Sequence, residues 1–171
     1  MGHIATSIWI VCYFLVLLGL SAYGIHRYTM IYLYWKHRKR RPEPSARFKE
    51  LPRITIQLPI FNELYVVRRL IGAVARLDYP KELLQIQILD DSTDETTTFC
   101  REEEAKLREE GFEVEYIHRV DRTGFKAGAL ENGMESATGE YIYILDADFV
   151  PEPDVLHEMI HFFTDKEVGL I

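Results

Sequence analysis

The chain has 171 residues, of which 47% are hydrophobic and 27% are charged. A chain of this length is long enough to form one domain with a buried core. Its net charge of −7 is unevenly divided. Residues 1–53 carry nine Lys and Arg against two Glu, whereas residues 54–171 carry eleven Lys and Arg against twenty-five Asp and Glu. Nucleic acid is bound through basic patches, so the acidic second part argues against a nucleic-acid-binding protein.

The first predicted element is an apolar helix. Residues 4–25 contain no Asp, Glu, Lys or Arg, and a helix of this length, at about 1.5 Å per residue, is long enough to cross a bilayer. A cleaved signal peptide is the main alternative, but it would begin with basic residues, and the first one here is Arg27. The aromatic-rich residues 28–35 either extend the helix or lie along the membrane surface.

A basic cluster, Lys-His-Arg-Lys-Arg-Arg, follows at residues 36–41. Lys and Arg gather on the cytoplasmic side of membrane helices, so we expect the rest of the chain to be cytoplasmic. The alternative, a nuclear-localisation signal, is disfavoured by the adjacent apolar span. Pro42 and Pro44 then indicate an extended linker. The predicted organisation is a transmembrane and interfacial segment over residues 1–35, a basic, proline-containing linker over 36–52 and a globular domain over 53–171.

Strands and helices alternate from residue 54 onward. The predicted strands are rich in β-branched and aromatic residues, and the predicted helices begin and end with capping residues. Strands are expected over residues 54–58, 84–89, 112–118 and 141–145, and helices over 62–77, 94–110, 124–137 and 154–163. We expect Pro59 to close the first strand. This order predicts an α/β fold with a mainly parallel sheet flanked by helices.

Polar side chains follow each of the four predicted strands. In a parallel sheet, ligands bind outside the carboxyl ends of the strands, so these side chains are expected to form one shared site. They are Asn62 and Glu63 after the first strand, Asp90 and Asp91 after the second, Arg119 to Lys126 after the third, and Asp146 and Asp148 after the fourth.

Asp146-Ala147-Asp148 is the strongest local signal. If strand geometry persists through these residues, the two carboxylates share a face, and like charges this close are unfavourable unless a cation or a proton intervenes. Oxygen ligands at a strand end suit Mg²⁺ or Mn²⁺ bound together with phosphate. The alternative is a solvated acidic turn. Lys126, near a helix start, is placed to bind phosphate, unless it is an ordinary solvated lysine.

Two nucleotide-binding classes are excluded by missing motifs. The chain has no GxxxxGK[ST] phosphate loop, which argues against a P-loop ATPase, and no GxGxxG after the first strand, which argues against dinucleotide binding. A Rossmann-like half without a glycine-rich phosphate loop remains.

The cysteines and histidines show no metal-binding pattern. Cys12 and Cys100 belong to no CxxC motif, which argues against a disulfide framework and a zinc site. His157 and His161 are spaced i, i+4, but no third ligand accompanies them, so we interpret both as surface residues of a helix.

Four stretches resemble the motifs of processive family 2 glycosyltransferases with the GT-A fold. They match in order and spacing between residues 52 and 171, and they are residues 57–63 (QLPIFNE), 88–96 (ILDDSTDET), 122–130 (RTGFKAGAL) and 146–148 (DAD). Within that family the chain is most similar to cellulose-synthase-like proteins of the glucomannan and xyloglucan-backbone kind and to their bacterial relatives.

The resemblance implies a membrane-anchored, inverting hexosyltransferase. Its donor would be a nucleotide-sugar of the UDP-glucose or GDP-mannose type, and its acceptor a glycan or a lipid. Glu63, Asp90 and Asp91 would bind the base and ribose, and Lys126 would lie by the diphosphate. Asp146 and Asp148 would hold Mg²⁺ or Mn²⁺ on that diphosphate, where the cation stabilises the charge of the leaving group.

The chain departs from the family pattern after Asp148. The family's catalytic base, an aspartate in a TED-like motif, and its acceptor-binding QxxRW motif have no counterpart there. We therefore expect an amino-terminal portion of a longer enzyme, or a truncated product, that binds the donor and hydrolyses it weakly at most. The alternatives are a non-catalytic, membrane-bound nucleotide-sugar-binding module or partner subunit, and a nucleotidyltransferase, which would release pyrophosphate from a nucleoside triphosphate.

Overall fold

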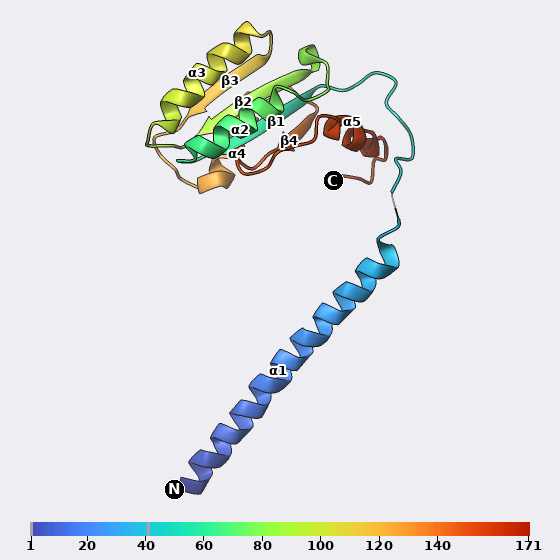
Figure 1. The fold of residues 1–171 in the computed structure, drawn as a ribbon, viewed down its shortest axis with the longest axis vertical. Coiled ribbons are helices and arrows are strands. Elements are labelled where there is room, and N and C mark those ends of the chain that lie inside the picture. The colour runs from blue at the N-terminus through green and yellow to red at the C-terminus, as the bar shows by residue number, and fades with distance from the viewer. Residues whose placement is uncertain (1, 41) are drawn as a thin grey trace. The chain divides into compact units, whose positions relative to one another are not determined.

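The computed structural model describes residues 2–40 and 42–171 and divides the chain into two compact units, the second being Pro44–Ile171. The first unit consists mainly of helix α1 (Gly2–His37), drawn in blue in Figure 1. The aromatic residues 28–35 continue this helix, which ends two residues into the predicted linker. Over Thr6–His37, α1 is the one helix in the described part of the chain that is long and apolar enough to cross a bilayer.

The second unit is built on four parallel strands (Figure 1): β1 (Ile54–Ile60), β2 (Leu84–Asp90), β3 (Glu113–His118) and β4 (Tyr141–Ile144). Their order in the sheet is β3-β2-β1-β4. The chain thus moves outward from β1 to β3 and then returns to the other side of β1. Such a reversal leaves a crevice at the carboxyl ends of the two strands where it occurs, here β1 and β4. The predicted α/β fold class is confirmed.

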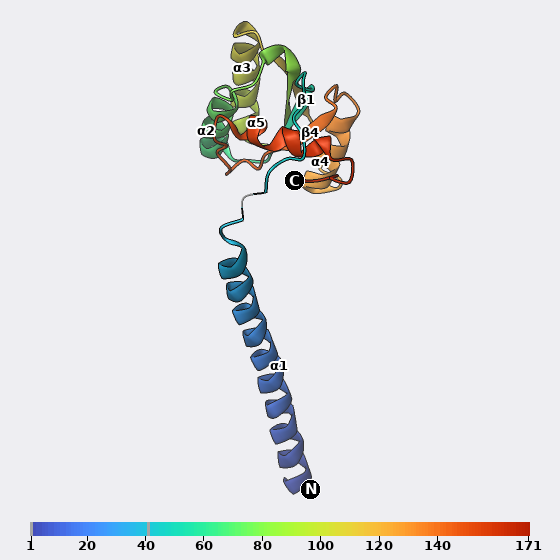
Figure 2. The same ribbon diagram turned by 90° about the vertical axis from the view of Figure 1, so that its right-hand side faces the viewer.

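Helices cover both faces of this sheet, as Figure 2 shows edge-on. One face is apolar and packs against α2 (Leu64–Val74), α3 (Thr96–Glu109) and α5 (Val155–Ile160). The short 3₁₀ helices η1 (Lys81–Leu83) and η2 (His161–Thr164) precede β2 and follow α5. The largest fully buried side chains of this core are Ile54, Ile56, Leu58, Leu70, Ile71, Leu84, Ile86 and Ile88.

The opposite face of the sheet carries buried amides and contacts α4 (Phe125–Met134). Gln57 donates from Nε2 to Oε1 of Gln87 at 3.0 Å, and Gln87 donates from Nε2 to the carbonyl oxygen of Gly133 at 2.8 Å. Gln85 donates likewise to the carbonyl oxygen of Ser136 at 2.9 Å. The last carbonyl groups of a helix lack partners within the helix, so the Gln87 amide bonds to the end of α4, the Gln85 amide bonds to the turn that follows it, and both fix this segment on the sheet.

The prediction that Pro59 closes the first strand is wrong, because β1 continues through Pro59 to Ile60. In a parallel strand, alternate residues bond to opposite neighbours. Gln57 accepts from Leu145, next to β4, and Ile60 accepts from Asp91, next to β2. Pro59 therefore faces the side of β4, whose paired register ends at Ile144 opposite Gln57. The missing N–H of proline interrupts no paired position there.

His161 is buried, contrary to the interpretation of a surface histidine, with 8% of its surface exposed. The N–H of Phe48 donates to its Nδ1 at 3.2 Å, and burial lowers the pKa of the imidazole below its ordinary value of 6.5. Thr164 Oγ1 also donates to the carbonyl oxygen of Ala46 at 3.3 Å. Part of the predicted linker therefore packs on η2, within the second unit.

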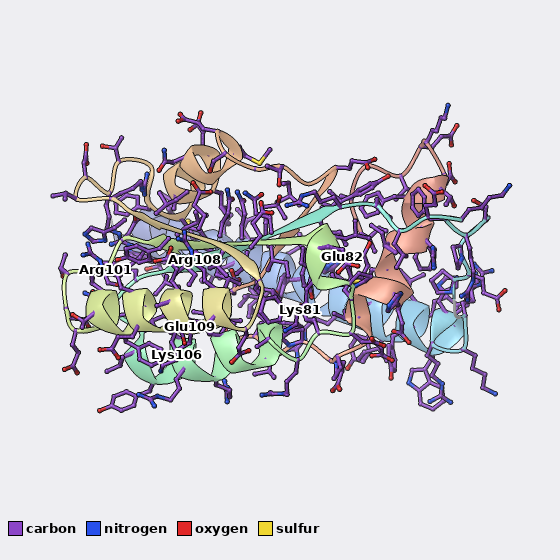
Figure 3. The ribbon with its side chains drawn as sticks, turned by 90° about the horizontal axis from the view of Figure 1, so that it is seen from above. Lys81, Glu82, Arg101, Lys106, Arg108 and Glu109 are labelled. Atoms are coloured by element: carbon purple, nitrogen blue, oxygen red, sulfur yellow. The ribbon has the colours of Figure 1, made fainter. Side chains whose placement is uncertain are left out.

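The outer surface of α3 is charged. Figure 3 labels residues of α3 and η1 on this side of the second unit: Arg101, Lys106, Arg108 and Glu109 on α3, and Lys81 and Glu82 on η1. Arg108 pairs with Glu104 at 2.8 Å, one helical turn away, and Lys106 pairs with Glu103. Such exposed pairs are screened by solvent and contribute little to stability.

Candidate functional site

A cavity of about 380 Å³ lies at the carboxyl ends of β1 and β4. This is the crevice that the reversal of strand order predicts. Its lining comes from all four strand ends and consists of Pro59, Ile60, Phe61, Glu63, Asp91, Arg122, Lys126, Ala129, Asp146, Ala147 and Asp148. Of the six predicted site residues, Glu63, Asp91, Lys126, Asp146 and Asp148 therefore line one cavity, and Asp90 does not.

Asp90 is buried and engaged within the protein. Its Oδ1 accepts the N–H of Ser92 at 2.9 Å, and its Oδ2 accepts the hydroxyl of Tyr116 at 2.7 Å. Burial and this hydrogen bond raise the pKa of Tyr116, which therefore stays a donor. The carboxylate thus fixes the turn after β2, and the structure does not bring it to the cavity.

The loops after β1 and β2 hold each other in place. Asn62 has a φ of 51°, which asparagine tolerates better than most residues. Its N–H donates to Ser92 Oγ at 2.8 Å, and its Oδ1 accepts the N–H of Thr93 at 2.8 Å. This reciprocal pair positions Phe61 and Glu63, the residues on either side of Asn62, at the rim of the cavity.

Asp91 is buried and forms a bidentate ion pair with Arg119, which is partly buried. Arg119 donates from Nε to Oδ1 at 2.8 Å and from Nη2 to Oδ2 at 2.6 Å, and these hydrogen bonds raise the pKa of the guanidinium further. Arg119 also donates to the carbonyl oxygens of Thr123 at 3.2 Å and Phe125 at 3.0 Å. The pair therefore joins β2 to the loop before α4.

Arg122, from the same loop, lies over an aromatic ring at the cavity wall. Its guanidinium carbon is 3.3 Å from the ring centroid of Phe61 and 5.3 Å from that of Phe125. Its Nε is 3.7 Å from Oδ2 of Asp91, is buried and makes no hydrogen bond. Stacking on a ring stabilises a cation and holds the guanidinium plane in one orientation.

The start of α4 depends on a glycine that permits close packing. A Cβ on Gly128 would lie 2.2 Å from the carbonyl oxygen of Thr123, so only glycine fits there. Gly124 has a φ of 76° and Phe125 a φ of 49°, which turn the chain sharply into the helix. Lys126 then points to the cavity and forms an ion pair with Asp146, in which about half of each side chain is exposed.

The Asp-Ala-Asp segment presents both carboxylates to the cavity, although the strand stops before it. β4 ends at Ile144, and the N–H of Phe149 donates to the carbonyl oxygen of Asp146 at 3.0 Å, closing a turn. Ala147 is buried between the two aspartates, which are exposed. The carboxylates therefore share one cavity through a turn, and the predicted strand geometry is not what brings them together.

These two carboxylates fit a hard divalent cation that has additional ligands. Within residues 2–40 and 42–171, no group of three or more His, Cys, Asp or Glu side chains could hold a metal ion. Asp146 and Asp148 would supply two oxygen ligands, and water or phosphate oxygens would supply the others. Mg²⁺ at nucleotide sites typically takes this ligand set, with one or two carboxylates plus substrate phosphates.

Sequence reasoning placed residues 119–126 at this edge but missed Arg119, Arg122 and Phe61 as individual site residues. Arg122 lies within one of the matching motifs, and Phe61 lies within another, so the signal was present for both. The pairing of Arg119 with Asp91 depends on the loop conformation, which no local sequence pattern reveals.

The family model for glycosyl transferase family 2 matches residues 55–171. The chain belongs to glycosyl transferase family 2. This family-2 chain is 36% identical over 159 residues to probable glucomannan 4-beta-mannosyltransferase 10 of Arabidopsis thaliana, covering 84% of the chain and 29% of the relative. It is 40% identical over 145 residues to glucomannan 4-beta-mannosyltransferase 2 of the same plant, covering 78% and 27%. The predicted family and the similarity to its glucomannan branch are confirmed.

Two solved structures share this fold. A mannosyltransferase, PcManGT from Pyrobaculum calidifontis in complex with GDP-Man and Mn²⁺, aligns with a TM-score of 0.72 at 27% identity, over 88% of this chain and 44% of that protein. S. aureus TarS 1–349 aligns with a TM-score of 0.57 at 18% identity, over 67% and 33%, and this likeness supports the fold alone. The chain thus spans less than half the length of each of these relatives.

Proposed function

We propose that this chain binds the nucleotide-sugar donor of a membrane-anchored, inverting mannosyltransferase. The observation that carries the proposal is the cavity where Lys126, Asp146 and Asp148 converge in a family-2 fold. GDP-mannose is favoured over UDP-glucose as the donor, because the matched plant relatives are named mannosyltransferases and PcManGT is bound to GDP-Man. The acceptor is a growing glycan, as the names of the plant relatives suggest.

Asp146 and Asp148 would hold Mg²⁺ or Mn²⁺ on the donor diphosphate. The cation would neutralise charge on the nucleoside diphosphate as it leaves. Lys126 adds a second positive charge: its ammonium is paired with Asp146, and an arriving diphosphate gives it a stronger partner. Lys126 and the cation that the two carboxylates would hold together stabilise the negative charge that develops on the leaving diphosphate.

Glu63 and Asp91 take the nucleoside end of the donor in this proposal. Glu63 is exposed at the first turn of α2 and makes no capping hydrogen bond there, so its carboxylate is available to ribose hydroxyls. Asp91 is held by Arg119 and presents its remaining lone pairs to the cavity. Asp90, in contrast, positions the turn after β2 without touching the donor.

We propose that the residues described by the structure include no catalytic base. Each carboxylate of the cavity already has another role: Asp146 and Asp148 with the metal, Asp91 with Arg119, and Glu63 with the nucleoside. The expected reaction of the chain by itself is donor binding with weak hydrolysis at most. Efficient mannosyl transfer by the chain alone would contradict this part of the proposal.

We further propose that α1 spans the membrane with the second unit in the cytoplasm. The basic residues that follow the apolar stretch, at 36–41, give the orientation. Protease treatment of sealed vesicles tests it: the second unit is expected to be digested in inside-out vesicles and protected in right-side-out vesicles. The reverse pattern would contradict the orientation.

The metal site is tested by nucleotide binding to the full chain in detergent. Asp148→Asn is expected to weaken Mn²⁺-dependent binding of GDP by tenfold or more, since it removes one of two protein ligands, roughly 1.4 kcal/mol or more. Asp154→Asn is a matched control, because Asp154 lies beyond the cavity at the start of α5. Equal GDP affinity in Asp148→Asn and the unaltered chain would contradict the site.

A further inference from the structure

We propose that Arg122 selects guanine by donating to the O6 and N7 atoms of the base. The inference rests on the proposed donor site and deepens it, because it names the group that recognises the nucleobase. It starts from one observation that the diphosphate site leaves unexplained, namely a buried guanidinium nitrogen in the cavity wall without a hydrogen-bond partner.

The position of Arg122 points to the nucleoside end of the donor. Lys126, Asp146 and Asp148 mark the diphosphate end, beside β4. Arg122 lies over Phe61, which follows β1, and its Nε is 3.7 Å from Asp91, which follows β2. Since the strand order is β3-β2-β1-β4, a nucleotide with its phosphates at β4 extends its base toward the side of β2.

The orientation of Arg122 is fixed without using its hydrogen-bond donors. The Phe61 ring, 3.3 Å from the guanidinium carbon, and the Phe125 ring at 5.3 Å restrict the plane. Arg119 already occupies both oxygens of Asp91, at 2.8 and 2.6 Å, which leaves Arg122 only the longer ion pair. One third of the side chain is exposed while Nε is buried, so the terminal Nη groups are the donors left to reach the cavity.

The donor pattern of a guanidinium distinguishes guanine from uracil. Arginine only donates, and its planar fork matches two adjacent acceptors. Guanine offers such a pair in O6 and N7. Uracil offers O4 beside the N3–H group, which is a donor, so the fork meets one acceptor and one mismatched donor. Arg122 therefore favours a guanosine nucleotide over a uridine nucleotide.

The test measures binding of three nucleotides to the full chain in detergent with Mn²⁺. The probes are GDP, UDP and 7-deaza-GDP, which lacks the N7 acceptor. The unaltered chain is expected to bind GDP several-fold more tightly than 7-deaza-GDP and about tenfold or more tightly than UDP, the size expected for a bidentate Arg–guanine pair.

Two variants of Arg122 separate base recognition from phosphate attraction. Arg122→Met keeps an apolar stem against Phe61. It is expected to lower the affinity for GDP about tenfold, to change the affinity for UDP less than twofold and to abolish the preference for GDP over 7-deaza-GDP. Arg122→Lys keeps the charge but loses the fork, and it is expected to lose most of the preference as well. Arg76→Met is the control, because Arg76 is exposed and lies outside the cavity.

Four results would overturn the inference. An equal loss of affinity for all three nucleotides in Arg122→Met, rescued by Arg122→Lys, would show that Arg122 contacts phosphate. Equal binding of GDP and 7-deaza-GDP by the unaltered chain would exclude the N7 contact, without needing any variant to fold. Metal-dependent binding of UDP in preference to GDP would refute guanine selection and leave the donor site in place, whereas no metal-dependent nucleotide binding would refute both.

Discussion

Gly133 of α4 packs closely against the amide face of the sheet, and Gly133→Ala tests that packing. A Cβ at this position would lie 2.6 Å from Nε2 of Gln57 and 2.9 Å from both Oε1 of Gln87 and Cδ2 of Leu89. Distances under 3.0 Å require movement of the neighbours. Gln57 and Gln87 are at most 1% exposed and bond to each other and to carbonyl groups of α4, so movement breaks hydrogen bonds.

The expected cost follows from these contacts. Overpacking of a buried site costs roughly 1–3 kcal/mol, and each weakened buried hydrogen bond adds about 1 kcal/mol. Alanine recovers up to about 1 kcal/mol through its higher helix propensity. We therefore expect Gly133→Ala to lower the free energy of unfolding by about 1–3 kcal/mol.

Urea unfolding of the full chain in detergent, followed by far-UV circular dichroism, measures this change. Tryptophan fluorescence is unsuitable, because both tryptophans, Trp9 and Trp35, lie in α1. Gly72→Ala in α2 is the matched control: its Cβ would meet only Arg76 Nη1, at an ordinary 3.5 Å. This control is expected to stabilise the second unit by up to about 1 kcal/mol. A stability of Gly133→Ala equal to that of the unaltered chain would refute the packing argument.

Three further predictions concern charge and protonation. Lys126→Met is expected to raise the affinity for Mn²⁺ alone by up to about fivefold, because it frees Asp146 from a half-exposed ion pair, and to lower the affinity for GDP. Electron paramagnetic resonance measures the affinity for Mn²⁺, and calorimetry measures the affinity for GDP. A fall in both affinities would contradict the role of the lysine. Burial favours neutral His161, so the stability of the folded chain is expected to fall as the pH drops below about 6.5 toward the lowered folded-state pKa. His161→Asn cannot titrate, and it is expected to weaken this pH dependence in urea unfolding at pH 7.5 and 5.5. An unchanged pH dependence of stability in the variant would refute the assignment. Asp90→Asn is expected to lower the free energy of unfolding by about 1–2 kcal/mol, because it weakens the hydrogen bond with Tyr116. Loss of GDP binding at unchanged stability would show instead that Asp90 touches the donor.

The site could be predicted at the level of strand ends, because parallel strands bring their carboxyl ends to one edge whatever the details of packing. Which of Asp90 and Asp91 lines the cavity could not be predicted. Neighbouring residues of a strand point to opposite faces, and both aspartates satisfy the same motif. Only the positions of Tyr116 and Arg119 decide which carboxylate is enclosed and which lines the cavity.

The amide face shows a different limit of sequence reasoning. Strands β1 and β2 alternate apolar residues with Thr or Gln, a pattern typical of a sheet with one solvent-exposed face. In the structure Thr55, Gln57, Gln85 and Gln87 are buried, because α4 covers them and supplies carbonyl partners. That burial depends on contacts between segments far apart in the sequence. The positive φ angles before α4, which place Arg122 and Lys126, likewise depend on close packing at Gly128.

The most direct test of the donor site is a calorimetric titration of GDP-mannose into the full chain in detergent, with Mn²⁺ and then with chelator. We expect binding with Mn²⁺, a loss of at least tenfold in affinity with chelator, and weaker binding of UDP-glucose under the same conditions. Binding of GDP-mannose that is unchanged by chelator, or no binding in either condition, would contradict this expectation.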